Sequence, residues 1–372
     1  MQVFCFDCGY PAELTLDAWR CPSCGGAWEP AALPAFDAVN IQRQDFSIWR
    51  YGSMLGLDIV TPFVPMGVGW TPLVPAMLFD KKIHLKLEYL QPSGSFKDRG
   101  VNAMVNQLMH MGVSSMIEDS SGNAGASLAA HGARFGIHTE IYVPEDASRF
   151  KKHQISIYGV DLKTIPGTRK DTERAAHAAV GVRGTYASHA YHPAYLSGQM
   201  TVAFEVWEQL GGNIPDWILY PVAQGGQFIG AWLGWSKLYE AGEINRLPRM
   251  VAVQSAQVSP LYLAWRDGLD DVQAITPAGR TIAEGVSISN PVRGKRLLHV
   301  VRESHGRVMA IQEYAISEGQ RELAKLGYYV EPTSALVSAA LKELLAEIHE
   351  DDLVLMPLTG NGLKGEPTFN RV

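Results

Sequence analysis

The sequence lacks a long apolar run. None of its apolar stretches approaches the roughly 18 to 20 residues that are needed to span a bilayer. Its first residues, 1–5, also lack the basic and then apolar layout of a signal peptide. These two absences lead us to expect a cytoplasmic protein with no membrane partner.

An excess of positive charge is also missing. The formal net charge is −6 and the sequence pI is near 6.0, which argues against a broad surface for nucleic acid. No Gly-x-Gly-x-x-Gly segment opens a predicted helix with an acidic residue suitably downstream, so a dinucleotide-binding oxidoreductase is disfavoured. The expected partner is a small molecule.

Cysteine is scarce and unevenly placed. The four cysteines form two Cys-x-x-Cys pairs near the start of the chain, separated by twelve residues: Cys5, Cys8, Cys21 and Cys24. Two such pairs can surround one ion with four thiolates, and the glycines after each pair let the backbone turn toward it. The spacing predicts a small structural zinc (Zn²⁺) ribbon, with a redox dithiol or two disulfides as the alternatives.

Apolar residues, in contrast, are plentiful. They make up 47% of the 372 residues, enough for a sizeable core and for two to three domains of about 150 residues each. After the cysteines, residues 29–75 are rich in proline and aromatic residues with little periodicity, which predicts an extended segment wrapping the main body.

From residue 81 onward, predicted strands and helices alternate. Their apolar periodicities predict strands at 83–87, 115–119, 138–144, 160–165, 217–220, 250–253 and 353–356, and helices at 97–111, at 148–158 and from Asn123 onward. The most apolar of these strands are of the kind found inside a parallel sheet that is covered on both faces. We therefore predict two α/β domains behind the ribbon.

Lys97 is the strongest candidate for a catalytic residue. It stands at the predicted start of helix 97–111, just past a strand. The helix dipole disfavours a cation at that end, and an amine that attacks aldehydes must lose its proton easily. Lys97 therefore suits a Schiff base, although a lysine placed at random is most often a solvated surface residue.

Several segments in the same chain order resemble one family. The segment 92–100 around Lys97 is similar to the pyridoxal-phosphate lysine segment of the fold-type II enzymes, and its Asp-Arg after the lysine is most similar to threonine synthases. The other matching segments are 69–73, 120–125, 221–227, 331–335 and 357–364. Some threonine synthase relatives also carry a similar N-terminal ribbon.

The resemblance implies a fold and a division of the chain. The fold is α/β and similar to the tryptophan synthase β chain, with two three-layer α/β/α domains and pyridoxal 5′-phosphate in the cleft between them. The implied parts are a zinc ribbon at 1–30, a large cofactor-binding domain at 31–100 and 206–372, and a small mobile domain at 101–205. A homodimer is implied as well.

The resemblance also assigns roles to single residues. Lys97 would hold the cofactor as a Schiff base, and Asn123 would hydrogen-bond its phenolic oxygen. Thr359 would meet the pyridine nitrogen as a neutral hydroxyl, which disfavours transamination and favours elimination and replacement. Taken alone, Asn123 and Thr359 are compatible with ordinary turns.

Two loops would hold anionic groups. At a helix start, backbone N–H groups and the positive end of the dipole can converge on a phosphate or a carboxylate. By resemblance, the residues that hold the substrate α-carboxylate are Ser120, Ser121, Gly122, Asn123 and Ala124. Those that hold the cofactor phosphate are Ala223, Gln224, Gly225, Gly226 and Gln227. Ala223 stands where the family usually has glycine.

The chain departs from the family in segment 192–201. Family members usually have Asn-Pro-x-Arg-x-x-Gly-Gln-Lys-Thr there, whose side chains help hold the substrate phosphate. Tyr195 stands at the arginine position and Met200 at the lysine position. The loss of both cations weakens phosphate binding, because charge-assisted hydrogen bonds are worth about 1.5 to 3 kcal/mol each. The candidates to compensate are Arg99, Lys152 and His192.

Three functions stay open at this point. The first is a threonine synthase-like lyase that converts O-phosphohomoserine and water into threonine and phosphate, with Lys97 removing the α-proton. The second is a relative that uses a non-phosphorylated amino acid, such as a serine or threonine ammonia-lyase or a cysteine synthase-like β-replacement enzyme. The third is a non-catalytic protein of this fold whose ribbon mediates contacts.

Overall fold

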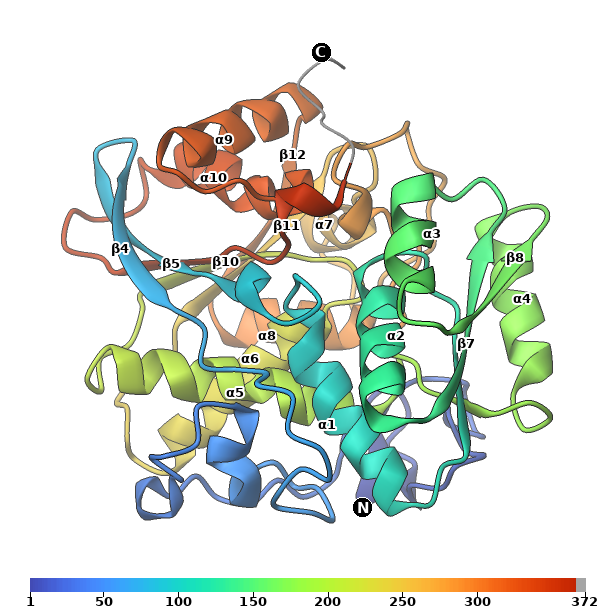
Figure 1. The fold of residues 1–372 in the computed structure, drawn as a ribbon. Helices are drawn as coiled ribbons and strands as arrows, with labels where there is room; N and C mark the ends of the chain where they lie inside the picture. The colour runs from blue at the N-terminus through green and yellow to red at the C-terminus, as the bar shows by residue number, and fades with distance from the viewer. Residues whose placement is uncertain (366–372) are drawn as a thin grey trace. The chain divides into compact units, whose positions relative to one another are not determined.

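A computed structural model describes residues 1–365 of the chain (Figure 1). The chain divides into two compact units. Unit 1 comprises Met1–Trp70 and Gln91–Thr201, and unit 2 comprises Thr71–Leu90 and the chain from Val202 onward. Among the described residues, no helix combines the length and the apolar character that a membrane span requires.

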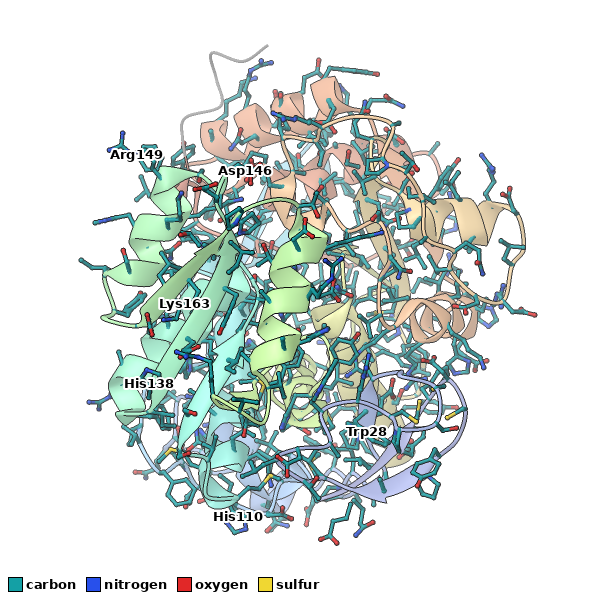
Figure 2. All side chains as sticks on the ribbon, turned by 90° about the vertical axis from the view of Figure 1, so that its right-hand side faces the viewer. Trp28, His110, His138, Asp146, Arg149 and Lys163 are labelled. Carbon is teal, nitrogen blue, oxygen red and sulfur yellow. The ribbon has the colours of Figure 1, made fainter. Side chains whose placement is uncertain are left out.

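Unit 1 begins with a small antiparallel sheet. Strand β1 (Gln2–Cys5) lies between β2 (Pro11–Glu13) and β3 (Trp28–Pro30). Val3, Cys5 and Trp28 are buried in a core of its own, and Trp28 is labelled in Figure 2. The first thirty residues therefore form the ribbon-like sheet that the cysteine spacing predicts.

The segment after the ribbon differs from the prediction. Residues 29–75 were expected to be extended, but they contain two 3₁₀ helices, η1 (Ala38–Asn40) and η2 (Ile48–Met54). Asp37 and Ser47 cap these helices by accepting hydrogen bonds from backbone N–H groups two residues further on. Such local caps stabilise turns without any apolar period, so periodicity could not reveal them.

The rest of unit 1 is a three-layer α/β arrangement. Its parallel sheet has the strand order β8-β7-β6-β9. The strands are β6 (Ser115–Glu118), β7 (His138–Pro144), β8 (Asp161–Ile165) and β9 (Thr185–Tyr186). The helices are α1 (Lys97–His110), α2 (Asn123–Phe135), α3 (Arg149–Ser156) and α4 (Arg169–Ala179). Figure 1 shows α2 and α3 on one face of the sheet and α4 on the other.

Unit 2 holds a larger sheet of the order β12-β11-β10-β13-β5-β4, parallel except for β4. The strands are β4 (Leu73–Leu78), β5 (Lys81–Lys86), β10 (Trp217–Pro221), β11 (Arg249–Ser255), β12 (Arg307–Ile311) and β13 (Val354–Pro357). The helices are α6 (Gly226–Glu240), α7 (Pro260–Arg266), α8 (Gly294–Glu303), α9 (Glu313–Lys325) and α10 (Pro332–Leu344), with the short η3 (Glu88–Leu90), η4 (Glu284–Val286) and η5 (Gly362–Lys364). Helix α5 (Pro193–Gln209) begins in unit 1 and ends in unit 2.

Helices cover both faces of the sheet in unit 2. Figure 1 shows α9 and α10 on one face of the sheet, and α6 and α8 on the other. Two α/β parts behind a ribbon are therefore confirmed.

The antiparallel edge strand β4 was not predicted. Leu78 pairs with Lys81, so Phe79 and Asp80 alone make the turn between β4 and β5. Both have a positive φ, 52° and 60°, as a tight hairpin turn requires. Phenylalanine is not a residue that signals such a turn, so the sequence gives no local sign of the hairpin.

The compact units group two segments differently from the implied domains. Residues 31–70 and 91–100 group with the four-stranded sheet of unit 1, whereas the resemblance assigned them to the large domain. The boundary after Thr201 lies close to the expected one at residue 205. A small mobile domain at 101–205 is a statement about motion, and it stays a prediction.

Candidate active site

Lys97 is the first residue of α1, where the sequence placed it. Its Nζ lies 4.6 Å from the ring centroid of Phe96 and 5.9 Å from that of Tyr195. Burial lowers the pKa of Lys97 to about 8, while the carboxylate of Glu118 acts in the opposite direction. The shift has the predicted direction, but burial rather than the helix dipole is its main cause.

The turn that presents Lys97 is fixed by Asp98. This carboxylate is fully buried and accepts hydrogen bonds from the Ser93 backbone N–H at 2.7 Å, the Ser93 hydroxyl at 2.6 Å and the Ser127 hydroxyl at 2.5 Å. Ser127 belongs to α2. One aspartate therefore ties the loop before Lys97 to the neighbouring helix.

The predicted carboxylate loop forms the start of α2. Gly122 is its N-cap, and no described side chain makes a capping hydrogen bond there. The Ser120 hydroxyl accepts a hydrogen bond from the Gly122 N–H at 3.3 Å. A Cβ on Gly125 would overlap the Ser120 carbonyl oxygen, so the loop folds tightly onto its own helix. The structure thus brings residues 120–124 together around a helix start that suits an anion.

Two adjacent carboxyl groups lie just before this loop, Glu118 as the last residue of β6 and Asp119 directly after it, and the sequence analysis did not assign them a role. Asp119 accepts a hydrogen bond from the Tyr186 hydroxyl at 2.7 Å and forms an ion pair with Arg169 at 2.7 Å. Although burial opposes ionisation, Arg169 and Tyr186 hold the pKa of Asp119 below its ordinary value. Burial and the neighbouring Asp119 charge raise the pKa of Glu118 to about 8. Adjacent groups with separated pKa values are typical of acid–base sites.

In unit 2, the predicted phosphate loop precedes α6. Gly225 is the N-cap with φ +77°, and a Cβ there would overlap the side chain of Leu297. The Gln224 side chain accepts a hydrogen bond from the Val292 N–H at 2.9 Å, which anchors the loop. Ala223 does not adopt a positive φ, so alanine is compatible with this position.

Gln227 gives independent support for a ligand at this loop. Its side chain is only 3% exposed, yet neither its Nε2 nor its Oε1 has a partner among the described residues. A buried amide without hydrogen bonds costs about 1 to 3 kcal/mol. Such a group next to a helix start is expected where a polar ligand completes the hydrogen bonding.

Thr359 follows β13 and is buried beside α10. Its Oγ1 lies 2.9 Å from Ser334 Oγ, and Ser334 Oγ accepts hydrogen bonds from the backbone N–H groups of Thr359 at 3.0 Å and Gly360 at 2.9 Å. These contacts fix a pair of neutral hydroxyls at the end of the strand. Ser334 lies in the 331–335 segment, so the sequence indicated its region but not its contact.

The residues at the family's phosphate-binding positions are buried in unit 1. Tyr195 and Met200 both have no exposed surface, and the ring of Tyr195 packs so closely on α1 that a Cβ on Gly100 would overlap it. The suggested substitutes have contacts of their own in the fold. Arg99 is fully buried and donates to Thr201 Oγ1 at 3.0 Å, Lys152 donates to the Glu145 carbonyl at 2.9 Å, and His192 accepts from the Ala194 N–H at 3.3 Å.

The four ribbon cysteines gather at one point. Their sulfur atoms all lie within 4.8 Å of one another, with Cys5 and Cys24 at 3.5 Å and Cys8 and Cys21 at 3.6 Å. A tetrahedral zinc with Zn–S bonds of about 2.3 Å holds its sulfurs about 3.8 Å apart. The cysteines are free rather than disulfide-bonded, so the donor set fits a zinc ion.

The ribbon packs on the α/β part of unit 1 through Trp19. The indole ring lies 4.6 Å from the ring of His177, 4.8 Å from Tyr186 and 4.8 Å from Tyr191. Tyr186 is the residue that donates to Asp119. An aromatic cluster therefore connects the ribbon with the end of β6.

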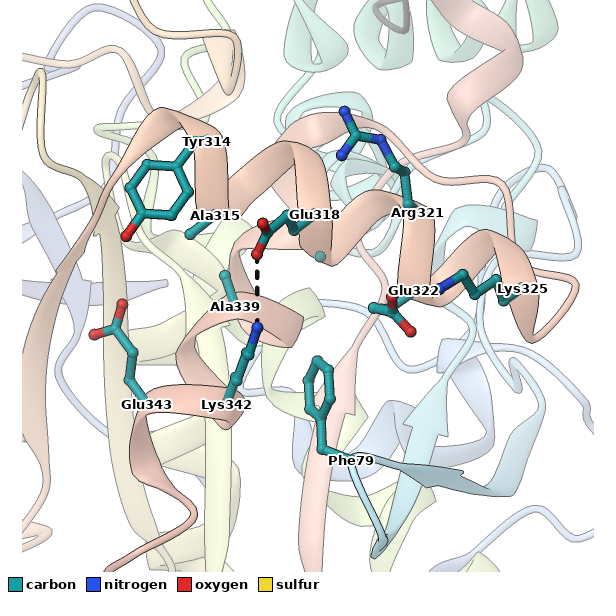
Figure 3. Close-up of a pocket in the computed structure, with 11 residues that line it drawn as sticks. Phe79, Tyr314, Ala315, Glu318, Arg321, Glu322, Lys325, Ala339, Lys342 and Glu343 are labelled. Atoms are coloured by element: carbon teal, nitrogen blue, oxygen red, sulfur yellow. Dashed lines mark hydrogen bonds and ion pairs between the residues drawn. The ribbon is translucent and has the colours of Figure 1, made fainter. Parts of the chain in front are cut away.

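A cavity of about 510 Å³ lies in unit 2 between α9 and α10 (Figure 3). Charged side chains and Phe79 line it, and Glu318 and Lys342 form an ion pair across it at 3.6 Å. None of the predicted site residues lines this cavity. It is therefore separate from the candidate active site.

Comparison with known proteins identifies the family. A family model described as pyridoxal-phosphate dependent enzyme matches residues 64–360. The chain belongs to this family. The match spans every predicted cofactor and substrate residue, from Lys97 to Thr359, and leaves out the ribbon cysteines.

Known relatives of this pyridoxal-phosphate-dependent enzyme include threonine synthases. The threonine synthase of Methanocaldococcus jannaschii is 30% identical over 97% of this chain and 92% of the relative. The threonine synthase of Mycobacterium bovis is 32% identical over 81% of this chain and 83% of the relative.

Similar solved structures include a T.th. threonine deaminase. It has a TM-score of 0.69 and 26% identity, and the match covers 80% of this chain and 94% of the deaminase. Maize serine racemase shares the fold, with a TM-score of 0.70 and 23% identity. The match covers 86% of this chain and 93% of the racemase.

The residues of this enzyme fit pyridoxal phosphate. Lys97 supplies an amine that is partly neutral near pH 8, and the Gly225 loop supplies a helix start beside the unsatisfied amide of Gln227. Thr359 supplies a neutral hydroxyl. These are the donor types that an aldehyde, a phosphate and a pyridine nitrogen require.

Proposed function

We propose that this protein is a pyridoxal-phosphate-dependent lyase of the threonine synthase type, which eliminates or replaces a group on an amino-acid substrate. The observation that carries the proposal is Lys97, whose pKa burial lowers to about 8 in a chain whose family depends on this cofactor. A solvated lysine would be almost fully protonated at that pH. Lys97 is therefore suited both to hold the cofactor and to move protons.

When bound, pyridoxal phosphate supplies an electron sink that makes the α-proton of an amino acid acidic. Lys97 Nζ accepts that proton and later returns it. Residues 120–124 orient the substrate by binding its carboxylate at the start of α2. The loop 223–227 holds the cofactor phosphate. Thr359 presents a hydroxyl rather than a carboxylate, which leaves the ring nitrogen unprotonated and favours elimination.

The similarity to threonine synthases favours O-phosphohomoserine as the substrate of this protein. Threonine synthase converts O-phosphohomoserine and water into threonine and phosphate. A second candidate is a non-phosphorylated amino acid, used by an ammonia-lyase or a β-replacement enzyme. It is supported by Tyr195 and Met200, which are neutral and buried where the family carries two cations. The threonine deaminase among the fold neighbours is consistent with it.

One assay separates the candidates. The purified protein is loaded with cofactor and given O-phosphohomoserine, L-threonine or L-serine in separate reactions. Phosphate together with threonine supports the first substrate, whereas ammonia together with a 2-oxo acid supports the second. A protein that never acquires the absorbance of lysine-bound cofactor contradicts both and supports a non-catalytic role.

The remaining expectations are proposals of the same kind. We propose that the four cysteines hold a structural zinc ion, because the sulfur separations match a closed tetrahedral site with no position for substrate. A homodimer and a cytoplasmic location stay predictions. Metal analysis and a mass measurement in solution test the first two.

A further inference from the structure

Elimination of a hydroxyl group needs a proton donor as well as the base Lys97, and the placement of Glu118 suits that role. Glu118 is the last residue of β6, two positions before Ser120 of the carboxylate loop. It is only 1% exposed. A buried carboxyl group next to a substrate-binding loop is costly to retain unless it is paired or used.

The partners of Glu118 are weaker than those of its neighbour. Asp119 has an arginine and a tyrosine hydroxyl, as described above. Within residues 1–365, Glu118 accepts hydrogen bonds only from backbone groups, Asp119 N–H at 3.3 Å and His189 N–H at 3.2 Å, and it lies 3.4 Å from His189 Nδ1. No lysine or arginine among residues 1–365 forms an ion pair with Glu118. A buried carboxyl without a cation retains its proton more readily than one with a cation.

Ring contacts connect Glu118 with the surroundings of Lys97. The His189 ring, next to Glu118, lies 6.0 Å from the Tyr195 ring, and Lys97 Nζ lies 5.9 Å from the centroid of that same ring. Glu118 also acts electrostatically on Lys97. The amine, the aromatic ring, the imidazole and the carboxyl therefore follow one another within unit 1, with Tyr195 and Glu118 buried and Lys97 and His189 partly buried.

We propose that Glu118 is a second acid–base residue of this site, which gives its proton to the departing hydroxyl of an unphosphorylated β-hydroxy amino acid while His189 holds the carboxyl in position. The proposal rests on the proposed function and names its substrate class. Serine and threonine have this chemistry. Because hydroxide is a poor leaving group, its departure needs a proton, whereas phosphate leaves as a stable anion.

The step balances in atoms and charge. Lys97 Nζ takes the α-proton and becomes an ammonium. The bond between the β-carbon and its oxygen breaks, the electron pair stays on the oxygen, and the oxygen takes the Glu118 proton to leave as water. Glu118 becomes a carboxylate. A neutral amine and a neutral acid have thus become an ion pair, and transfer of one proton from Lys97 to Glu118 restores them.

Titratable and charged groups surround Glu118 from several elements of unit 1. The titratable and charged groups that face Glu118 are Lys97 on α1, Asp119 after β6, Arg169 on α4, Tyr186 on β9, His189 before α5 and Tyr195 on α5. The Arg169 charge is engaged by Asp119. With a pKa of about 8, Glu118 is mostly protonated at neutral pH and able to act as an acid. Its proton is lost as the pH rises through about 8.

The test compares two leaving groups in one protein. Glu118→Gln keeps the size and the hydrogen-bond acceptor but cannot donate an acidic proton. For L-serine or L-threonine, the elimination rate of the cofactor-loaded variant should fall by about 100- to 10,000-fold. For β-chloro-L-alanine, whose chloride leaves without a proton, it should fall by less than about tenfold. Glu118→Asp, which keeps an ionisable carboxyl, should recover part of the lost rate.

The pattern of rates with the two substrates distinguishes the loss of an acid from general damage to the site. Equal losses for both substrates would overturn the proposal, because a misfolded or loosened site affects both reactions alike. Unchanged rates for both substrates would overturn it as well. Failure of the unmodified protein to act on β-chloro-L-alanine and on each of O-phosphohomoserine, L-serine and L-threonine would instead contradict the proposed function itself.

A second readout needs no cofactor and no turnover. The pKa of Lys97 is measured in the cofactor-free full chain from the pH dependence of its methylation by formaldehyde and borohydride. Since the Glu118 carboxylate favours the charged amine, Glu118→Gln should lower the pKa of Lys97 further, by about one unit. A rise toward the ordinary lysine value would show that Glu118 only excludes water, and would overturn its assigned role.

Discussion

The two units differ in the chemistry of the candidate site residues that each one holds. Around Lys97 in unit 1, burial brings the pKa values of both Lys97 and Glu118 to about 8. In unit 2, the loop 223–227 and the pair of Ser334 and Thr359 offer only backbone N–H groups, an amide and hydroxyls. The proposed proton-transfer residues therefore lie in unit 1 and the proposed phosphate-binding loop lies in unit 2, so substitutions in the two units should fail in different ways.

The largest effect is expected for Lys97→Ala in unit 1. Loss of the amine should remove the absorbance of lysine-bound cofactor and lower activity by at least about 1,000-fold. Absorbance spectra and turnover assays measure the two losses. Lys163→Ala is a matched control, because this lysine of β8 pairs with Asp161, away from the candidate site residues of unit 1. A variant without Lys97 that keeps the full spectrum would place the Schiff base on another lysine.

The protonation of the Lys97 amine as a function of pH gives a further test of the chemistry of unit 1. About half of its amines should be neutral at pH 8, whereas less than about 1% of ordinary lysines are. The folded pKa is lowered, so between about pH 8 and 10.5 the unfolded chain binds more protons, and this group makes folding more favourable as pH rises through that window. Carbon-13 NMR of the methylated chain measures the value, with Lys97→Ala identifying the signal. A value near 10.5 would show that the amine is solvated.

In unit 2, Gly225→Ala should weaken cofactor binding without moving any pKa in unit 1. A left-handed φ costs a non-glycine residue about 1 to 2 kcal/mol, and the new Cβ would also meet Leu297. We expect a 10- to 100-fold larger dissociation constant, on the order of 1.4 kcal/mol per tenfold, in a spectroscopic titration with pyridoxal phosphate. Gly242→Ala is the control, since it has φ +75° with no atom near its Cβ. Equal affinities in the two variants would place the phosphate elsewhere.

The smallest effect on activity is expected from the ribbon. Cys24→Ser should abolish stoichiometric zinc binding and lower Tm by roughly 5 to 10 °C, as for a loss of about 2 to 3 kcal/mol in a domain of this size. Because the ribbon contacts the rest of unit 1 through Trp19 and contains none of the predicted cofactor-binding residues, cofactor affinity should change little. Metal analysis and calorimetry test this, with Thr15→Ala as a ribbon variant that keeps all four sulfurs. Full zinc content in Cys24→Ser would contradict the four-cysteine site.

Much of the fold could be predicted from the sequence where one local pattern dominates. The strand 138–144 is buried along nearly its whole length and appears with the predicted bounds, and α1 begins at Lys97 as expected. The hairpin at Phe79 and Asp80 could not be found, because its positive φ angles arise in residues that rarely adopt them. The caps of η1 and η2 are similarly local and carry no apolar period.

The candidate site likewise has residues that the sequence could predict and contacts that it could not. Motif resemblance indicated Lys97 and the two anion-binding loops, whose residues are contiguous in the chain. It did not indicate the pairing of Glu118 with His189, which lie 71 positions apart, or the hydroxyl contact of Ser334 with Thr359. Sequence spacing gives no measure of burial either, and burial is what sets the pKa values of Lys97 and Glu118.

The packing of Trp19 on Tyr191 has a consequence for synthesis on the ribosome. The ribbon emerges first and can close around its own small core, yet the surface that Trp19 covers is completed only when His177, Tyr186 and Tyr191 have been translated. N-terminal parts of a chain generally fold before the rest has been made. The Trp19 indole therefore stays exposed to solvent until most of unit 1 has been translated. Its fluorescence on stalled nascent chains of increasing length would show at which chain length this part of unit 1 folds.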